Sequence, residues 1–374
     1  MVCLYTKWQD ALFQPQIILN LKKEKMKICF VLNKISTEKA GTSVALMTKA
    51  HNMGHEVYAM GVGDFKFQHQ GTIFLYTKYV DPSTKMETPK KYLKVLQSNS
   101  AKQSTIESTD LDVLFIRNNP TEEGASRHWA EQSGLAFGRM IQQQGVLVLN
   151  DANALSYGFI DKLYFEELPQ EIKPASLITR KKDDILNFWE KNNKQIVLKP
   201  LEGSGGKNVF LIDKHEKNLN QIIETISKDG YVIAQEYLPG VKKGDVRVLL
   251  MNGRILTEHG DQAIIRRVCN KGEFRSNFKQ GATADRSELT EAMQKIVDLT
   301  APKLIKDGLF FVGLDIIEDK LIEINILSPG GLDRFADIGL TDFTTSVIEA
   351  IERKLYYKLK YMGQIENKIL ATME

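Results

Sequence analysis

The residues best suited to chemistry lie in the stretch 314–325, where a short polar turn separates two apolar runs. This pattern predicts a tight β-hairpin whose side chains alternate between two faces. A turn centred on Asp319 pairs Asp315 with Glu323 and places Asn325 on the same face. Facing carboxylates repel each other unless a positive group lies between them, and Mg²⁺ prefers an all-oxygen donor set. A solvated polar face is the alternative, but the surrounding isoleucines and leucines favour a metal site at these three residues.

A glycine-rich loop after the predicted strand 195–200 is the second feature. Its glycines, Gly203, Gly205 and Gly206, allow the backbone to approach a ligand closely and to turn N–H groups toward it. The loop lies between two strands and does not open a helix, so it is neither a Walker A motif nor a dinucleotide fingerprint. A structural hairpin turn is the alternative. Lys199 ends the apolar strand, where its ammonium would be partly buried and would need an anionic partner. This favours a loop that covers the phosphate of a bound nucleotide.

Other charged residues could complete such a site. Lys162 lies on a predicted short helix, where a solvated lysine is the alternative. Glu236 ends a strand before a Pro-Gly turn and offers an acceptor for nucleotide hydroxyls or an exocyclic amine. Asp245 and Arg247 share one face of a strand, and a surface salt bridge is the alternative there. A basic cluster downstream would neutralise a transferring phosphoryl group if it lies beside the acidic hairpin. The cluster begins at Arg266 and Arg267, and Arg275, Asn277 and Lys279 follow it.

The elements before the loop predict a doubly wound α/β domain. Apolar runs of the kind found in buried parallel strands alternate with helical patterns. The strands are expected at 28–32, 56–60, 111–116 and 145–150, and the helices at 42–52 and 129–144. The segment 68–104 breaks this alternation and is expected to be irregular. No G-x-G-x-x-G follows the first strand, so a dinucleotide site is not expected.

From residue 151 the pattern changes to α+β. A hairpin is expected around Asn252-Gly253, which is a strong turn signal. Strands are expected at 175–179, 195–200, 208–212 and 231–237, and helices at 161–168, 183–192, 218–227, 288–306 and 342–358. The predicted divisions are an extension at 1–25, a Rossmann-like domain at 26–150, subdomains at 151–238 and 239–360, and a C-terminal tail at 361–374.

The composition excludes several classes of protein. Among 374 residues, 50 are Lys or Arg and 47 are Asp or Glu, and the net charge of +3 gives no electrostatic case for binding nucleic acid or a membrane. No apolar run approaches the ~20 residues of a membrane-spanning helix. Three separated cysteines, Cys3, Cys29 and Cys269, fit a reducing compartment. A cytoplasmic protein is therefore expected. Segment 1–25 lacks the apolar core of a signal peptide and is expected to be dispensable.

The order of these motifs resembles the ATP-grasp superfamily and, more narrowly, the bacterial type of glutathione synthetase. The resemblance is carried by residues 111–117, 161–163, 196–206, 235–239, 244–249, 311–317 and 323–325. It implies a Rossmann-like N-terminal domain followed by an ATP-grasp fold of two α+β subdomains. It also implies a ligase that uses ATP and Mg²⁺ (or Mn²⁺) to join glycine to γ-glutamylcysteine through an acylphosphate. Members are commonly oligomeric, so a homo-oligomer, dimer or tetramer, is expected.

The resemblance also implies roles for individual residues. Nucleotide contacts fall to Lys162, Lys199, Gly203, Ser204, Gly205, Gly206, Gln235, Glu236, Tyr237, Leu238 and Asp245. Arg247 and Arg267 are expected to be catalytic through charge neutralisation. Substrate contacts fall to Arg117, Arg266, Arg275, Ser328, Gly330 and Gly331, and metal contacts to Asp315, Glu323 and Asn325.

One segment departs from the family pattern. The family usually reads Ser-Pro-Thr before a small residue, whereas this chain has Ser328-Pro329-Gly330-Gly331. The segment borders the acceptor site in the family, so the acceptor is open at this point. A related ligase with another peptide or amino-acid substrate, or a nucleotide-binding module without catalysis, is the alternative.

Overall fold

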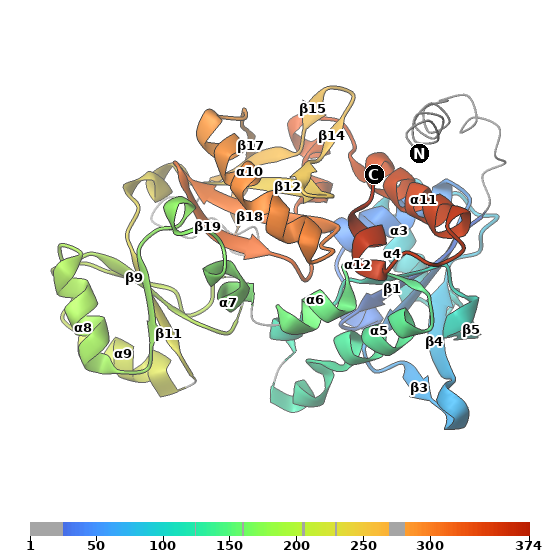
Figure 1. Ribbon diagram of the computed structural model, residues 1–374, viewed down its shortest axis with the longest axis horizontal. Helices are drawn as coiled ribbons and strands as arrows, with labels where there is room; N and C mark the ends of the chain where they lie inside the picture. Colours follow the sequence, from blue (N-terminus) through green and yellow to red (C-terminus); the bar gives the residue numbers. More distant parts are fainter. Residues whose placement is uncertain (1–24, 124, 159–160, 204–205, 229, 269–280) are drawn as a thin grey trace, which may run out of the picture.

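The computed structural model describes residues 25–123, 125–158, 161–203, 206–228, 230–268 and 281–374. At one end of the molecule lies a seven-stranded sheet in the order β3-β4-β2-β1-β6-β7, with β5 paired to β4 (Figure 1). Four strands of this sheet are parallel: β1 (Lys27–Leu32), β2 (Glu56–Gly61), β6 (Val113–Ile116) and β7 (Leu147–Leu149).

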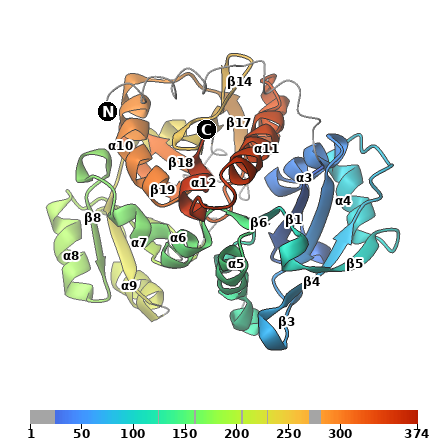
Figure 2. The ribbon, with the colours of Figure 1, turned by 45° about the vertical axis from the view of Figure 1, so that its right-hand side comes forward.

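Helices cover both faces of this sheet, as the alternation of side chains along β1 requires. Ile28 and Phe30 pack in a cluster with residues of α3 (Thr42–Asn52) and α4 (Pro89–Gln97). Cys29 and Val31 point the other way, into a cluster with α5 (Ser133–Gln143) and α6 (Ala152–Tyr157). The two helix layers lie on opposite sides of the sheet in Figure 2. The predicted doubly wound domain is confirmed.

The prediction of an irregular segment at 68–104 is wrong. This region contains β4 (Ile73–Tyr79), α4 and β5 (Lys102–Glu107), and β3 (Phe65–Phe67) precedes it. All three strands pair antiparallel at the edge of the sheet. Ile73, Leu75 and Thr77 alternate as buried residues along β4, so the edge hairpin has one packed face.

The rest of the chain forms two further large sheets, as expected for the ATP-grasp fold that the resemblance implies. The first has the order β10-β9-β11-β8 and the second the order β17-β16-β12-β18-β19, with β13 paired to β12. The first comprises β8 (Ser176–Thr179), β9 (Ile196–Pro200), β10 (Phe210–Ile212) and β11 (Val232–Glu236), packed against α8 (Lys182–Lys191) and α9 (Leu219–Lys228). The second comprises β12 (Asp245–Met251), β13 (Arg254–Ile255), β16 (Ile264–Val268), β17 (Thr283–Arg286), β18 (Phe311–Ile317) and β19 (Lys320–Asn325).

Further elements complete the fold. The remaining helices are α7 (Asp161–Glu166), α10 (Glu291–Lys306), α11 (Thr344–Lys360) and α12 (Asn367–Thr372). A small hairpin joins β14 (Thr257–Glu258) to β15 (Asp261–Gln262). Short 3-10 segments lie at 35–37, 69–71, 108–110, 120–122, 125–130, 170–172, 239–243, 332–334 and 336–338.

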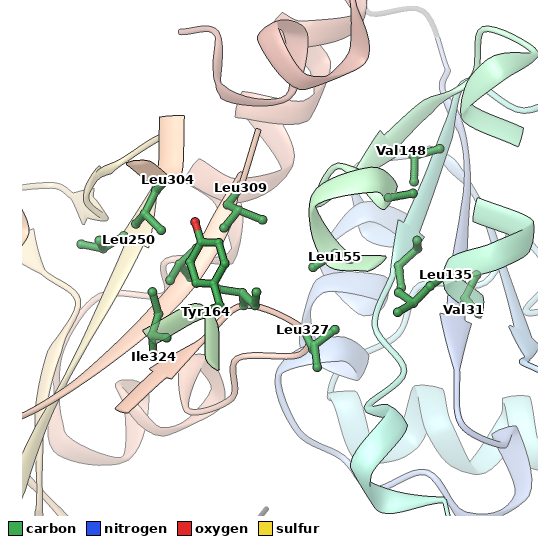
Figure 3. Close-up of a cluster of buried hydrophobic side chains, with 14 of the residues drawn as sticks. Val31, Leu135, Val148, Leu155, Tyr164, Leu250, Leu304, Leu309, Ile324 and Leu327 are labelled. Atoms are coloured by element: carbon green, nitrogen blue, oxygen red, sulfur yellow. The ribbon is translucent and has the colours of Figure 1, made fainter. Parts of the chain in front are cut away.

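One hydrophobic cluster extends from the N-terminal sheet into the ATP-grasp part (Figure 3). Val31 and Leu135 lie at its N-terminal end, while Leu250 and Ile324 lie at the other end. Leu327, on the chain leaving β19, lies between the two groups in Figure 3. The two parts are therefore joined by a shared core, which holds the ends of their sheets in a fixed relation.

Several expectations cannot be read from the described residues. Of the predicted extension 1–25, the described part is Lys25 alone, and Cys3 and Cys269 also lie outside. Cys29 is a free, buried cysteine. No helix among the described residues is long and apolar enough to cross a membrane.

Candidate active site

The predicted hairpin β18–β19 brings its acids together. Asp315 pairs with Glu323, as expected. The turn consists of two residues, Glu318 and Asp319, rather than being centred on Asp319, and the register shifts between the turn and the acidic pair. The extra residue, Ile322, forms a bulge, which turns successive side chains toward the same side. Ile322 and Glu323 accordingly line one pocket.

Arginines from neighbouring strands lie beside Asp315. Arg247, its cross-strand partner on β12, donates from Nε and Nη2 to the two carboxylate oxygens at 2.7 and 2.6 Å. Arg267 Nη2 lies 2.8 Å from Asp315 Oδ2. Arg267 also donates from Nε and Nη2 to Asp245 Oδ1 and Oδ2, at 2.7 and 2.5 Å. All four side chains are buried. The guanidinium groups of Arg247 and Arg267 therefore supply positive charge that reduces the repulsion between the facing carboxylates.

The charges in this network outweigh the effect of burial. Burial by itself raises the pKa of Asp315, but the charges of Arg247 and Arg267 lower that pKa to about 2. Burial likewise opposes the charge of Arg267, while Asp315 and Asp245 raise the pKa of this guanidinium above its usual value. Asp315 and Arg267 are thus both charged at neutral pH.

The hairpin retains oxygens that fit a hard cation. Among the described residues, Asp315 Oδ1 accepts a hydrogen bond only from Arg247 Nε, which leaves one of its lone pairs available. The Glu323 carboxylate accepts no hydrogen bond from any described residue, and Asn325 adds an amide 3.4 Å from Asp315 Oδ2. No group of three or more His, Cys, Asp or Glu in the described part of the chain could hold a metal. A magnesium site here therefore depends on the Asn325 amide and on ATP phosphates to complete an oxygen shell.

A pocket between the two ATP-grasp sheets gathers most of the predicted nucleotide residues. Predicted residues that line it are Lys199, Gly206, Gln235, Glu236, Tyr237, Leu238, Asp245, Arg267 and Glu323. Residues that the sequence reasoning missed line it too, namely Val197, Val209, Val241, Ile317 and Ile322. The apolar side chains suit the faces of a flat base, and the charged ones suit phosphates. The signal for Val197 was its spacing of two from Lys199 along one strand, which places both on one face.

The two predicted lysines hold different parts of the site. Lys199 Nζ lies 3.2 Å from Gln235 Oε1 and 3.5 Å from the carbonyl oxygen of Ile322. Lys162 Nζ donates to the carbonyl oxygens of Pro200 and Gly203, at 2.7 and 3.0 Å. Lys199 therefore links both sheets inside the pocket between them, and Lys162 fixes the start of the glycine-rich loop to α7.

A larger cleft of about 1250 Å³ lies between the N-terminal sheet and the glycine-rich loop. It opens beside the carboxyl ends of β1 and β6, where the strand order reverses, which is where α/β sheets bind ligands. Arg117 follows β6 and lines this cleft together with Ser43 and Gly203. Its side chain is only 4% exposed, and burial lowers its pKa to about 10. No carboxylate of the described residues forms an ion pair with Arg117, so an anionic ligand would suit it.

The segment 328–331 joins the two sites. Arg117 Nη2 donates to the carbonyl oxygen of Pro329 at 2.7 Å, and Ser328 Oγ donates to the carbonyl oxygen of Arg117 at 2.9 Å. Arg247 Nη1 donates to the carbonyl oxygen of Gly330 at 3.1 Å. The segment is therefore held by one arginine from each part of the molecule. Ser328 and Gly330 line the cleft, and Gly331 has the left-handed φ of 106° that favours glycine.

Some predicted site residues are not gathered here. Arg266 pairs with Val246, whose side chain lies in the core cluster, so strand alternation turns Arg266 away from Arg267 and the pocket between the two sheets. Ser204, Gly205 and Arg275 lie outside the described residues, as do Asn277 and Lys279. Of the predicted basic cluster, the described residue that lies beside the hairpin is Arg267, together with Arg247 from β12.

Two family models match the chain and together span most of it. The N-terminal domain of prokaryotic glutathione synthetase matches residues 26–156, and its ATP-grasp domain matches residues 161–339. Glutathione synthetase of Vibrio parahaemolyticus is 31% identical over 337 residues, which is 88% of this chain and 99% of the relative. Glutathione synthetase of Escherichia coli K12 is 31% identical over 322 residues, which is 85% of this chain and 94% of the relative.

Two solved structures are similar to the chain in fold while sharing little sequence with it. The ATP-grasp ligase PsnB, complexed with a minimal precursor, has a TM-score of 0.54 at 16% identity and covers 87% of this chain and 98% of its own. The macrocyclase MdnC from Microcystis aeruginosa, bound to the precursor peptide MdnA, has a TM-score of 0.57 at 12% identity and covers 87% and 99%. These similarities establish the ATP-grasp fold.

Proposed function

This chain belongs to the prokaryotic glutathione synthetase family, and from that premise we propose that it joins the amine of glycine to the cysteine carboxylate of γ-glutamylcysteine. It is an ATP-dependent ligase of glutathione biosynthesis. The observation that carries the proposal for this site is that one pocket combines Lys199, the segment 235–238 and the acid Glu323, next to a cleft lined by Arg117.

The reaction balances without a protein nucleophile. The γ-phosphoryl group of ATP passes to the peptide carboxylate, which gives an acylphosphate and ADP. The glycine amine then attacks the acyl carbon, loses a proton, and expels phosphate as the amide bond forms. The protein's contribution is to position three substrates and to balance the charge of the phosphoryl group.

We assign the nucleotide to the pocket between the sheets. Val197 and Ile322 would contact the faces of the base, Gln235, Glu236, Tyr237 and Leu238 would contact its edge, and Asp245 would lie toward the ribose. Lys162, Lys199 and the glycines at 203–206, with Ser204, would lie toward the phosphates. The support is that the described members of this set, apart from Lys162 and Gly203, line one pocket.

We assign Asp315, Glu323 and Asn325 as ligands of Mg²⁺, with Mn²⁺ as an alternative ion. When bound, the ion supplies positive charge to phosphate oxygens. Arg247 and Arg267 would keep Asp315 ionised and oriented, and would add positive charge behind it. The oxygen-only donor set supports this assignment.

We assign the peptide to the cleft at the ends of β1 and β6. Arg117 would bind a substrate carboxylate, because no carboxylate of the described residues forms an ion pair with it and the charge of Glu38 offsets the effect of burial on its pKa only in part. Ser328, Gly330 and Gly331 would lie beside the acceptor amino acid. Arg266 and Arg275 remain sequence-based candidates for substrate contact.

We further propose that the protein acts in the cytoplasm as a homo-oligomer, a dimer or a tetramer, without nucleic-acid or membrane partners. The near-balanced charge supports the absence of polyanionic partners. Light scattering coupled to gel filtration would measure the oligomeric state directly, and a monomer at micromolar concentration would contradict this part of the proposal.

Phosphate release tests the function. With ATP and Mg²⁺, phosphate should appear only when γ-glutamylcysteine and an amino-acid acceptor are both present, and mass spectrometry should find the tripeptide. Omission of Mg²⁺ should abolish release, and replacement by Mn²⁺ should restore it. Release that does not require γ-glutamylcysteine would contradict the proposal.

A further inference from the structure

Gly330 is a glycine for which the fold gives no reason. Its φ is not positive, and a Cβ built on it would contact no heavy atom within 4 Å. The other described glycines with a negative φ for which this space is known, such as Gly158 and Gly313, all have neighbours within that distance. A glycine makes the folded protein less stable than an alanine at the same position would, because the unfolded chain has more conformational entropy at a glycine. The missing side chain therefore leaves space for something other than the protein.

The space around Gly330 belongs to the substrate cleft. Gly330 lines this cleft with Ser328 and Arg117. Its carbonyl oxygen is held by Arg247, which also forks Asp315. Gly330 is thus one side chain away from the acidic hairpin, where the phosphoryl group is transferred if the proposed function holds.

The chemistry around Gly330 favours a carboxylate. Because the Pro329 and Gly330 carbonyl oxygens face arginines, the N–H groups of Gly330 and Gly331 point the opposite way across their trans peptide planes. Neither N–H donates to a described residue. These two N–H donors, on the side of the segment away from the two arginines, suit the carboxylate of a small amino acid.

We propose that Gly330 forms one wall of the acceptor subsite and that its missing methyl group admits an acceptor with a small side chain, alanine or serine, as well as glycine. This inference rests on the proposed function and specifies its acceptor. The argument is one of volume: a Cβ is absent from the wall, so the acceptor can carry one.

Competing acceptors and one substitution test the inference. Wild-type protein should use alanine with a kcat/KM within about tenfold of that for glycine. Gly330→Ala should restore the methyl group to the wall, raise the KM for alanine at least tenfold, and change the KM for glycine and for γ-glutamylcysteine much less. Its thermal midpoint should not fall, since the new Cβ meets nothing.

Gly41→Ala is the control, because Gly41 lines the same cleft in an extended conformation and a Cβ there would meet no atom closer than 3.9 Å. It should leave the glycine-to-alanine ratio unchanged. Wild-type protein that uses glycine but rejects alanine would overturn the inference alone, as would an unchanged ratio in Gly330→Ala. Wild-type protein that releases no phosphate with γ-glutamylcysteine and glycine would overturn the proposed function and the acceptor assignment together.

Discussion

Asp315 and Glu323 face each other across one hairpin, yet they have different surroundings. Asp315 is 1% exposed and accepts hydrogen bonds from two buried arginines, whereas Glu323 is partly exposed at the pocket and accepts none from the described residues. The first carboxylate is therefore part of the fold as well as a candidate metal ligand. The second makes no such contact with the described part of the fold, so we propose that it serves the ligand alone.

Substitution should separate these two roles. Asp315→Asn should destabilise the protein by about 3 kcal/mol, because it leaves buried guanidinium groups without their carboxylate. Glu323→Gln should change the free energy of unfolding by less than about 0.5 kcal/mol. Both variants should lose phosphate release. Urea unfolding followed by circular dichroism measures the difference, and equal stabilities would contradict the role of Asp315 in the fold.

The stability that Asp315 contributes depends on pH in a definite direction. Its pKa is about 2 in the folded protein and near 3.9 in the unfolded chain, so the contribution is complete above about pH 4 and is lost as the pH falls toward 2. Wild-type protein should lose stability over that interval, and Asp315→Asn should lose less.

At the scale of elements, local patterns predicted more than the site's contacts. Periodicity and turn residues predicted the strand 195–200, the turn at Asn252-Gly253 and the Asp315–Glu323 pair. The structure has all three, with the strand at Ile196–Pro200. The region 73–107 carried a usable signal. Thr88 and Pro89 are typical residues for the start of a helix, and they open α4. Buried and more exposed side chains alternate along the first part of β4, as in a strand with one packed face. The lysine-rich composition there obscured it.

Long-range contacts had no local signal. Arg117 contacts Pro329 across more than two hundred residues of sequence, and Arg247 contacts Asp315 across 68. Side-chain type suggested that these residues carry function, but only the folded sheets determine which partners they meet. The bulge at Ile322 also escaped prediction, because it changes the register without changing the Asp315–Glu323 pair.

Helix α7 should control the glycine-rich loop through Lys162. Lys162→Met removes the bonds to the Pro200 and Gly203 carbonyl oxygens, so amide exchange at 201–203 should accelerate. The KM for ATP should rise about tenfold, and the free energy of unfolding should change by no more than about 1 kcal/mol. Lys191→Met, at the exposed end of α8, is the control and should behave as wild type. Unchanged exchange and KM in Lys162→Met would exclude this role.

At the scale of the whole molecule, the C-terminal residues connect both parts. The predicted tail 361–374 contains α12, whose Asn367 exchanges hydrogen bonds with Val148 on β7, at 2.8 and 2.9 Å. From α11, Lys354 Nζ donates to Asn252 Oδ1 at 2.8 Å and to the carbonyl oxygen of Met373 at 2.6 Å. The last residues therefore fix the ATP-grasp sheet to the edge of the N-terminal sheet.

Lys354 should make the stability of this connection depend on pH. Its side chain is fully buried, and burial lowers its pKa to about 7; the charge of Arg353 acts in the same direction and that of Glu374 opposes it. In the unfolded chain a lysine has a pKa near 10.4. Between these values the unfolded chain binds one more proton than the folded protein, so stability rises with pH.

The expected rise from pH 7 to pH 9.5 is on the order of 3 kcal/mol. Below pH 7 both states are protonated, and the cost of burying the charge is constant. Lys354→Met removes the titrating group, so its free energy of unfolding should lack this rise, although lost hydrogen bonds to Asn252 and Met373 lower it overall. Lys360→Met, at an exposed position on the same helix, should keep the wild-type dependence. Urea unfolding of the three proteins at both pH values measures the difference, and parallel changes in wild type and Lys354→Met would show that Lys354 stays charged in the folded protein.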